Sequence, residues 1–127
     1  MPHLRKAINE RRLERKKIDP KVALDGLMRD GIRMALRGKK GGESWCSLVG
    51  YTAQELKIHL ERQFLPGMTW DNRGKGGWVV DHIIPRTAFS YDSAADEEFK
   101  ACWSLTNLRP LWEADNLKKG AERTTLL

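Results

Sequence analysis

Apolar residues recur at helical spacing in two segments of the first half of the chain. In one segment Asp19 and Pro20 precede the apolar stripe, and this pair is typical of a helix start, with Asp as the cap and Pro in the first turn. In the other, Thr52 and Glu55 form a capping-box pattern. The two stripes comprise Leu24, Leu27, Met28, Ile32, Ala35 and Leu36, and then Ala53, Leu56, Leu60 and Phe64. The pattern predicts two helices, and a glycine-rich loop at residues 38–42 separates them.

The last third of the chain has a different pattern. Trp78 to Val80 is a short β-prone run, and Leu108 to Trp112 is a second one that Pro110 interrupts, which fits an edge strand or a bulged strand. Glu113 to Lys119 has the composition of a final helix that Gly120 closes. The order strand, long loop, strand, helix, with N-terminal helices in front of it, predicts an α+β fold.

Positive charge is concentrated in the first forty residues. Residues 1–40 contain 13 Lys and Arg against 5 Asp and Glu, whereas residues 41–127 contain 10 against 12. This division, together with the glycine-rich loop, predicts a basic helical arm at residues 1–40 and a second domain at residues 41–127. A basic arm suits a nucleic acid partner, although a solvated helix face has the same composition. The arm residues expected to contact nucleic acid are Arg11, Arg12, Arg15, Lys16 and Lys17.

Composition argues against several other classes of protein. No apolar run approaches the roughly 20 residues that span a bilayer, and no apolar stretch follows the basic N-terminus, so a secretory signal is not expected. We therefore expect a soluble, cytoplasmic protein with no membrane partner. Cys46 and Cys102 do not form a C-x-x-C pair, so no structural zinc is expected. A disulfide between them remains open, but a buried free thiol fits a reducing cytosol better.

The residues best suited to chemistry follow the first β-prone run. Asp81 and His82 are neighbours, and Pro85 blocks continuation of the strand. In a regular strand the two side chains point to opposite faces, which favours a structural histidine, whereas a bulge or turn would let both reach one substrate atom. Asn107 opens the second predicted strand, and Asn116 follows Asp81 by 35 residues on the predicted last helix. Asp and Asn oxygens suit Mg²⁺ or Mn²⁺, and His suits a general base near neutral pH.

Three segments together resemble the HNH nuclease family. They are Trp78-Val79-Val80-Asp81-His82-Ile83-Ile84-Pro85, Thr106-Asn107-Leu108-Arg109-Pro110-Leu111-Trp112, and Asp115-Asn116-Leu117-Lys118-Lys119-Gly120. They also resemble the HNH domain of CRISPR effector nucleases, and the segments at 50–64 and 66–72 resemble small HNH proteins of bacteriophages and prophages. The resemblance covers roughly residues 48–120. It implies a ββα-metal nuclease unit, and the predicted order of strands and helix agrees with that fold.

The resemblance implies a role for each matching residue. Asp81 and Asn116 would bind the metal ion, His82 would be the general base, and Asn107 would hold the loop between the strands and so orient His82. Because Asn116 stands in the place of the family's final histidine, the chain is an H-N-N variant, which favours hard ions, Mg²⁺ or Mn²⁺. The residues expected to contact the DNA backbone near this site are Arg86, Lys118 and Lys119. For each of these three cations, a plain solvated charge is an equal alternative.

The expected function is metal-dependent hydrolysis of DNA phosphodiester bonds, by nicking or double-strand cutting. In this one-metal mechanism His82 activates a water molecule, and the products carry a 5′-phosphate and a 3′-hydroxyl. One alternative is a DNA-binding module that has lost cleavage. A second is a phage assembly factor that recruits the packaging enzyme, a terminase. The resemblance to phage and prophage proteins implies a bacterial host cell as the setting.

Overall fold

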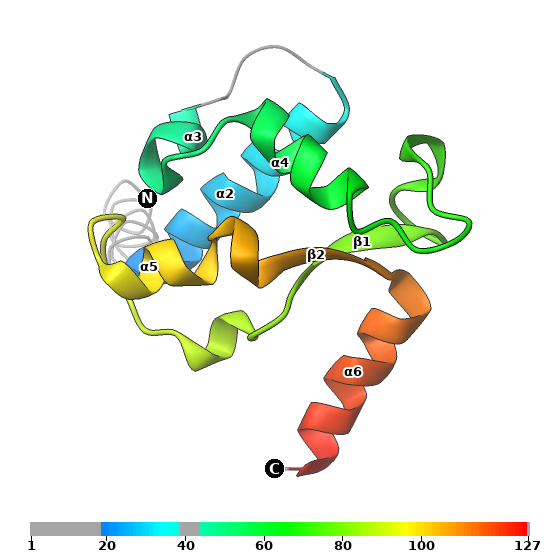
Figure 1. Cartoon of the computed structure of the whole chain (residues 1–127). Helices are drawn as coiled ribbons and strands as arrows, with labels where there is room; N and C mark the ends of the chain where they lie inside the picture. The colour runs from blue at the N-terminus through cyan, green and yellow to red at the C-terminus, as the bar shows by residue number, and fades with distance from the viewer. Residues whose placement is uncertain (1–18, 39–43, 127) are drawn as a thin grey trace, which may run out of the picture.

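The protein is described here by a computed structural model, which covers residues 19–38 and 44–126. Helices and short 3₁₀ turns surround a small sheet in this part of the chain (Figure 1). The elements in order are α2 (Pro20–Leu36), α3 (Ser44–Val49), α4 (Ala53–Glu61), η1 (Trp70–Asn72), β1 (Trp78–His82), η2 (Arg86–Ala88), α5 (Glu97–Cys102), η3 (Leu105–Asn107), β2 (Leu108–Trp112) and α6 (Glu113–Leu126). The fold is therefore α+β, as the sequence pattern predicts.

The sheet consists of β1 and β2, which pair antiparallel without interruption. The register runs from Trp78 opposite Trp112 to His82 opposite Leu108. Both strands are edges in a two-stranded sheet, so Pro110 is accommodated without a bulge. The bulge that could have turned neighbouring side chains at the end of β1 toward one point is also absent. Side chains of β1 therefore alternate strictly between the two faces of the sheet.

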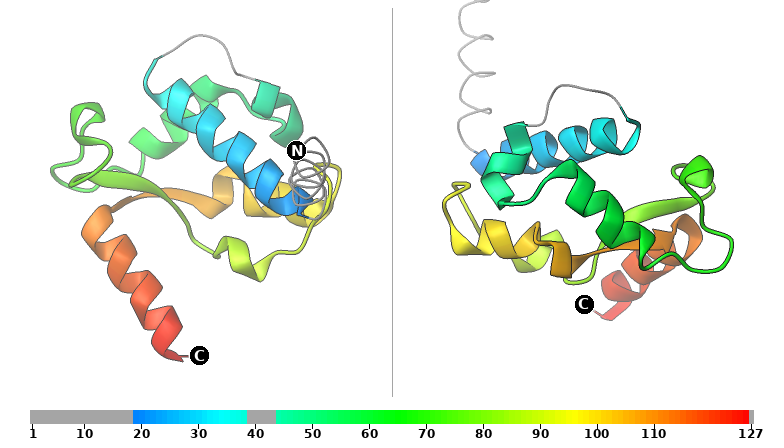
Figure 2. Two further views of the ribbon diagram at one scale, coloured as in Figure 1. Left: turned by 180° about the vertical axis from the view of Figure 1, so that it is seen from behind. Right: turned by 45° about the horizontal axis from the view of Figure 1, so that its top comes forward.

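The two faces of the sheet are covered differently. Helices α2, α3 and α4 lie on one side of the hairpin, and α6 lies on the other (Figures 1 and 2). The core lies on the side of the three helices, where the largest fully buried side chains are Trp45, Trp78, Phe99, Met28, Leu56, Leu60, Leu108 and Cys102. Among the described residues, α2 shares this one core with the sheet. Residues 20–36 are thus packed into the body of the molecule, which differs from the separate arm expected for residues 1–40.

The helix starts agree closely with the sequence pattern. The Asp19 side chain caps α2 by accepting a hydrogen bond from Val22 N–H at 3.2 Å, and Thr52 and Glu55 form the predicted capping box of α4. One residue assigned to the apolar stripe of α2 is not buried. Leu27 is exposed, because it lies about 100° around the helix from its buried neighbour Met28.

The last helix is longer than its sequence indicates. Gly120 was expected to close it, but α6 continues from Glu113 to Leu126. A glycine inside a helix costs only about 1 kcal/mol relative to alanine, so it weakens the helix without forcing an end. Among the described residues, no helix is both long enough and apolar enough to cross a membrane.

Candidate functional site

Asp81 is the centre of a buried ion-pair cluster on the α6 side of the sheet. Its exposed fraction is 6%. One carboxylate oxygen, Oδ2, accepts hydrogen bonds from Arg109 Nε at 2.9 Å and from Lys119 Nζ at 2.8 Å. Arg109 stands directly opposite on β2, and Lys119 reaches across from α6. The Lys119 ammonium also donates to the carbonyl oxygen of His82 at 2.8 Å. Two oxygens of β1 thus converge on one cation.

Helix α6 is held against the hairpin at its first turn. Glu113 N–H donates to the carbonyl oxygen of Gly77 at 2.8 Å, and the Glu113 carboxylate accepts from Gly76 N–H at 3.2 Å. These bonds tie the start of α6 to the loop that precedes β1. Asn116 lies three residues before Lys119, so the two side chains share one face of the helix. Lys118 is exposed to solvent.

Asn107 clamps the backbone that follows His82. Its side-chain oxygen accepts from Ile84 N–H at 2.7 Å, while its amide nitrogen donates to the carbonyl oxygens of Ile84 at 3.1 Å and Cys102 at 2.9 Å. Its backbone carbonyl also accepts from Ile83 N–H at 2.8 Å. The side chain is buried. These are the contacts that a loop-holding residue needs, and they fix the point where the chain leaves β1.

His82 faces the opposite side of the sheet from Asp81. Its ring packs edge-on against Trp103, with 4.4 Å between ring centroids, and its Nε2 atom is buried without a hydrogen-bond partner. Burial, and then the positive charge of Arg86, lower the pKa of His82 to about 4. The imidazole is therefore neutral at pH 7, and in this position it is a weaker base than an ordinary histidine. The structure does not bring the His82 ring and the Asp81 carboxylate together.

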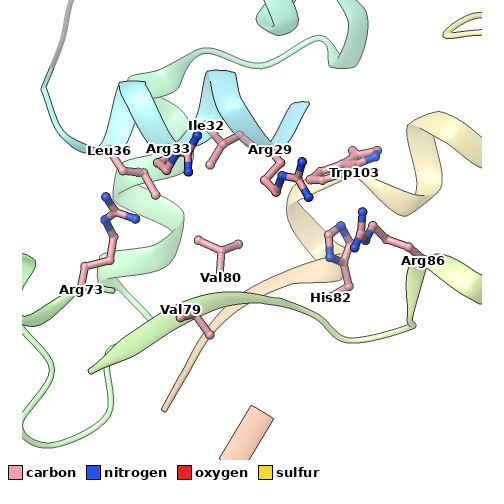
Figure 3. A pocket seen from close by; sticks show the side chains of 10 residues that line it. All are labelled: Arg29, Ile32, Arg33, Leu36, Arg73, Val79, Val80, His82, Arg86 and Trp103. Atoms are coloured by element: carbon pink, nitrogen blue, oxygen red, sulfur yellow. The ribbon is translucent and has the colours of Figure 1, made fainter. Parts of the chain in front are cut away.

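A cationic cavity of about 340 Å³ opens beside His82, between β1 and α2 (Figure 3). We call it the arginine cavity. Its polar lining comes from Arg29, Arg33, Arg73, Arg86, His82 and Trp103. Its apolar lining comes from Ile32, Leu36, Val79 and Val80. Of the cations expected to contact DNA, Arg86 lines this cavity, while Arg11, Arg12, Arg15, Lys16 and Lys17 lie outside the described residues.

A buried carboxylate that the sequence analysis missed supports this cavity. Asp25 on α2 is 8% exposed. It accepts hydrogen bonds from the Tyr91 hydroxyl and, at 3.1 Å, from Trp103 Nε1, and it lies 3.6 Å from the Arg86 guanidinium. The sequence carried a signal for it, because Asp25 precedes Met28 by three residues and so falls within the apolar stripe of its helix. The spacing of Arg29 and Arg33 places them on one helix face, but no feature of the sequence indicated that this face lines a cavity.

Comparisons with known proteins give one viral relative. Over 120 residues the chain is 32% identical to "Uncharacterized protein L246" of Acanthamoeba polyphaga mimivirus, a match that includes 94% of this chain and 51% of the relative. The chain thus spans about half the length of that protein. No protein-family model matches the chain, and no solved structure matches it significantly.

Proposed function

We propose that this chain is a metal-dependent DNA endonuclease of the HNH type. The observation that carries the proposal is the order of elements around the sequence motif. An antiparallel hairpin is followed at once by a helix packed on one of its faces, and Asp81 lies on that face with Asn107 at the start of β2 and Asn116 on the helix. This order agrees with a ββα-metal unit, which the resemblance implies.

The oxygens near α6 fit a cation. The Asp81 carboxylate and the His82 carbonyl oxygen already share the Lys119 ammonium, at 2.8 Å each, so a positive charge is favoured at this point. Asp81 and Asn116 would hold a Mg²⁺ or Mn²⁺ ion, which keeps most of its waters and needs few protein ligands. When bound, the ion would polarise a phosphate oxygen and offset charge on the departing 3′ oxygen. Among the described residues, no three His, Cys, Asp or Glu side chains cluster, so the donor set is small.

Lys119 competes for these oxygens. Its ammonium and a divalent ion cannot both occupy the space between Asp81 and the His82 carbonyl, because like charges repel strongly at such distances. Metal binding therefore requires the Lys119 side chain to swing away. Arg109 can stay on Asp81, because it approaches from the neighbouring strand and not from α6.

The general-base role of His82 sets a second requirement. The neutral ring has the right protonation state to take a proton from water, but it faces Trp103 and the arginine cavity. Activation of a water molecule at a phosphate near Asp81 therefore requires the backbone at the end of β1 to change so that His82 turns toward the α6 face, because side-chain torsions alone cannot move the ring across the sheet. The Asn107 hydrogen bonds to Ile84 and the Lys119 hydrogen bond to the His82 carbonyl hold this backbone, so they would have to be released for that change.

The same geometry supports a second candidate, a DNA-binding module that does not cut. In this alternative Asp81 is a structural carboxylate, neutralised by Arg109 and Lys119, and His82 is a structural wall of the cavity. The strict alternation of Asp81 and His82 across the sheet is the observation that favours it.

Nicking of supercoiled plasmid separates the two candidates. The wild-type protein should nick in Mg²⁺ or Mn²⁺ and stop in excess EDTA. His82→Ala should lower the rate by roughly 100- to 10,000-fold at every metal concentration, as expected for loss of a general base. Asp81→Ala should be rescued in part by more metal, because it removes a ligand and not the base. Asp92→Ala, at an exposed carboxylate with no role in the site, should nick like wild type. Nicking that persists in chelator would exclude the metal-dependent mechanism. An absence of nicking in both Mg²⁺ and Mn²⁺ would exclude the nuclease.

A further inference from the structure

We propose that the arginine cavity binds one nucleotide unit of a single nucleic acid strand, with its phosphate held between Arg33 and Arg73 and the rest of the unit extending toward Arg29 and Arg86. This inference rests on nucleic acid as the partner, which is part of the proposed function, but it does not depend on cleavage. The cavity lies on the face of β1 remote from Asp81, so it is separate from the residues that would hold the metal ion.

The charges lining the cavity are only partly balanced. Arg86 lies 3.6 Å from Asp25, and Arg29 and Arg33 share the exposed Asp30 at 3.9 and 3.0 Å. In the described part of the chain, no carboxylate comes within ion-pairing distance of Arg73. Four guanidinium groups therefore face two carboxylates. An excess of positive charge around a concave site attracts an anion, and planar guanidinium groups match the geometry of phosphate oxygens.

Arg73 is the guanidinium most in need of a counter-charge. Burial and then the positive charges of Arg37 and Arg33 lower its pKa. An anion between Arg73 and Arg33 would offset both effects, because it would supply hydrogen-bond acceptors to a half-buried donor and weaken the repulsion between like charges. The loop carrying Arg73 and the helix carrying Arg33 meet at one end of the cavity, and Arg86 lies at the other end (Figure 3).

The remaining wall fits the other parts of a nucleotide. Ile32, Leu36 and Val80 give an apolar floor for a sugar or base edge. The His82 ring and Trp103 close the end of the cavity near Arg86. A volume of about 340 Å³ is in the range of small-ligand pockets. It suits one unpaired nucleotide, and a base-paired duplex is too wide to enter.

Binding in EDTA tests the proposal apart from cleavage. The probe is a fluorescein-labelled oligothymidylate of eight nucleotides. Its fluorescence anisotropy gives the binding affinity at each concentration in a salt series. Arg73→Gln should weaken binding at least about tenfold, the usual effect of losing a charge-assisted hydrogen bond. It should also reduce the slope of log affinity against log salt by about 0.7, the value for one phosphate contact on a single strand. Arg29→Gln should act in the same direction.

The matched control is Arg62→Gln, an exposed arginine at the end of α4 that does not line the cavity. It should bind within about twofold of wild type, since a lone surface cation contributes little. Thermal melting of each variant excludes unfolding as the cause. Thymidine 5′-monophosphate should compete with the probe, and inorganic phosphate should compete much less.

Three results would overturn the inference: unchanged binding by Arg73→Gln, an equal loss in Arg62→Gln, or equal competition by inorganic phosphate. The last would indicate a simple anion site. If the wild-type protein does not nick in Mg²⁺ but binds the probe in a way that depends on Arg73, the nuclease proposal is wrong and the nucleotide site stands. If the protein nicks in Mg²⁺ but its binding of the probe does not depend on Arg73, the nucleotide site is wrong and the nuclease proposal stands.

Discussion

Asp25 joins three parts of the molecule through one carboxylate. It accepts hydrogen bonds from Tyr91 and Trp103, and it pairs with Arg86, so α2, the segment after η2 and the end of α5 meet at this residue. A buried carboxylate is tolerated only when such partners replace the lost water. Trp103 and Arg86 both line the arginine cavity, so Asp25 also fixes the shape of that cavity.

Removal of Asp25 should be costly. Asp25→Ala leaves Trp103 Nε1 buried without an acceptor and the Tyr91 hydroxyl with only the weak acceptor Cys102 Sγ at 3.8 Å, and we expect the free energy of unfolding to fall by about 2–4 kcal/mol. Asp30→Ala on the same helix removes only an exposed carboxylate and its surface pairs, so it should change stability by less than about 1 kcal/mol. Urea unfolding of the two variants measures the difference. Equal effects would show that Asp25 is not a structural centre.

The sequence identified the residues of the candidate site, but it did not predict toward which face of the sheet their side chains point. Asp81, His82, Asn107 and Asn116 were found by their order and spacing, and Asn107 makes loop-holding contacts of the kind that the resemblance implies. The direction of His82 could not be predicted, because it depends on whether strand pairing stays regular to the end of β1. The contact of Lys119 with Asp81 was also out of reach, since it depends on where α6 crosses the sheet.

At the scale of elements, α2 and α3 meet through a glycine. A Cβ atom added at Gly31 would lie 2.2 Å from Cδ1 and 2.8 Å from Cγ of Trp45, whose side chain is fully buried. The indole therefore lies directly on the α2 backbone, and only glycine permits this approach. Gly26, in the same helix, has no heavy atom within 4 Å of its added Cβ, so its neighbourhood is open.

Substitution by alanine should change the free energy of unfolding in opposite directions at the two glycines of α2. Gly26→Ala should raise the free energy of unfolding by up to about 1 kcal/mol, because alanine is the better helix former and nothing obstructs it. Gly31→Ala gains the same propensity but must displace the Trp45 ring, and overpacking of this kind costs about 1–3 kcal/mol or more. Thermal or urea unfolding of both variants decides the matter. Stabilisation by Gly31→Ala would mean that α2 and α3 do not pack this closely.

Helices with strong end signals were predicted best. The Asp19-Pro20 start and the Thr52 capping box carry their own local chemistry, so no knowledge of the fold was needed. Helix α3 (Ser44–Val49) was missed, because a six-residue helix shows too few turns for a periodic stripe. It is stabilised mainly by burying Trp45 against α2, a tertiary contact that local sequence does not encode.

The whole molecule is organised around β1, whose two faces carry different chemistry. One face holds Asp81 and its cations beneath α6, and the other holds His82 beside the arginine cavity and the three-helix layer. The proposed nuclease needs these faces to cooperate during the reaction, through a change of the backbone at His82 and withdrawal of Lys119. The proposed nucleotide site needs only the face that carries His82.

Two tyrosine hydroxyls join the three-helix side of the molecule to the other side of the core, one at the turn after α5 and one at the segment between η2 and α5. Tyr51 donates to the carbonyl oxygen of Trp103 at 2.6 Å, and Tyr91 donates to Asp25. Burial is the main cause that raises the pKa of both groups above the ordinary tyrosine value, and for Tyr91 the hydrogen bond to Asp25 adds to it. These two are the only tyrosines in the sequence, so tyrosine ionisation reports directly on the folded state.

Stability should therefore fall in alkaline solution. Above about pH 10, the ordinary tyrosine pKa, the unfolded chain loses both phenolic protons while the folded protein keeps them. The unfolded state then binds fewer protons, so the free energy of unfolding decreases with pH, by up to about 1.4 kcal/mol per pH unit for each tyrosine. Urea unfolding from pH 8 to 11 measures the slope, and absorbance at about 295 nm should show no tyrosinate before unfolding. Tyr51→Phe removes one ionising group and should make the alkaline slope shallower, although the protein is less stable at pH 8 because the Trp103 carbonyl loses its donor. A slope unchanged by that substitution, or tyrosinate formed in the folded protein near pH 10, would show that the hydroxyls are not buried partners of the core.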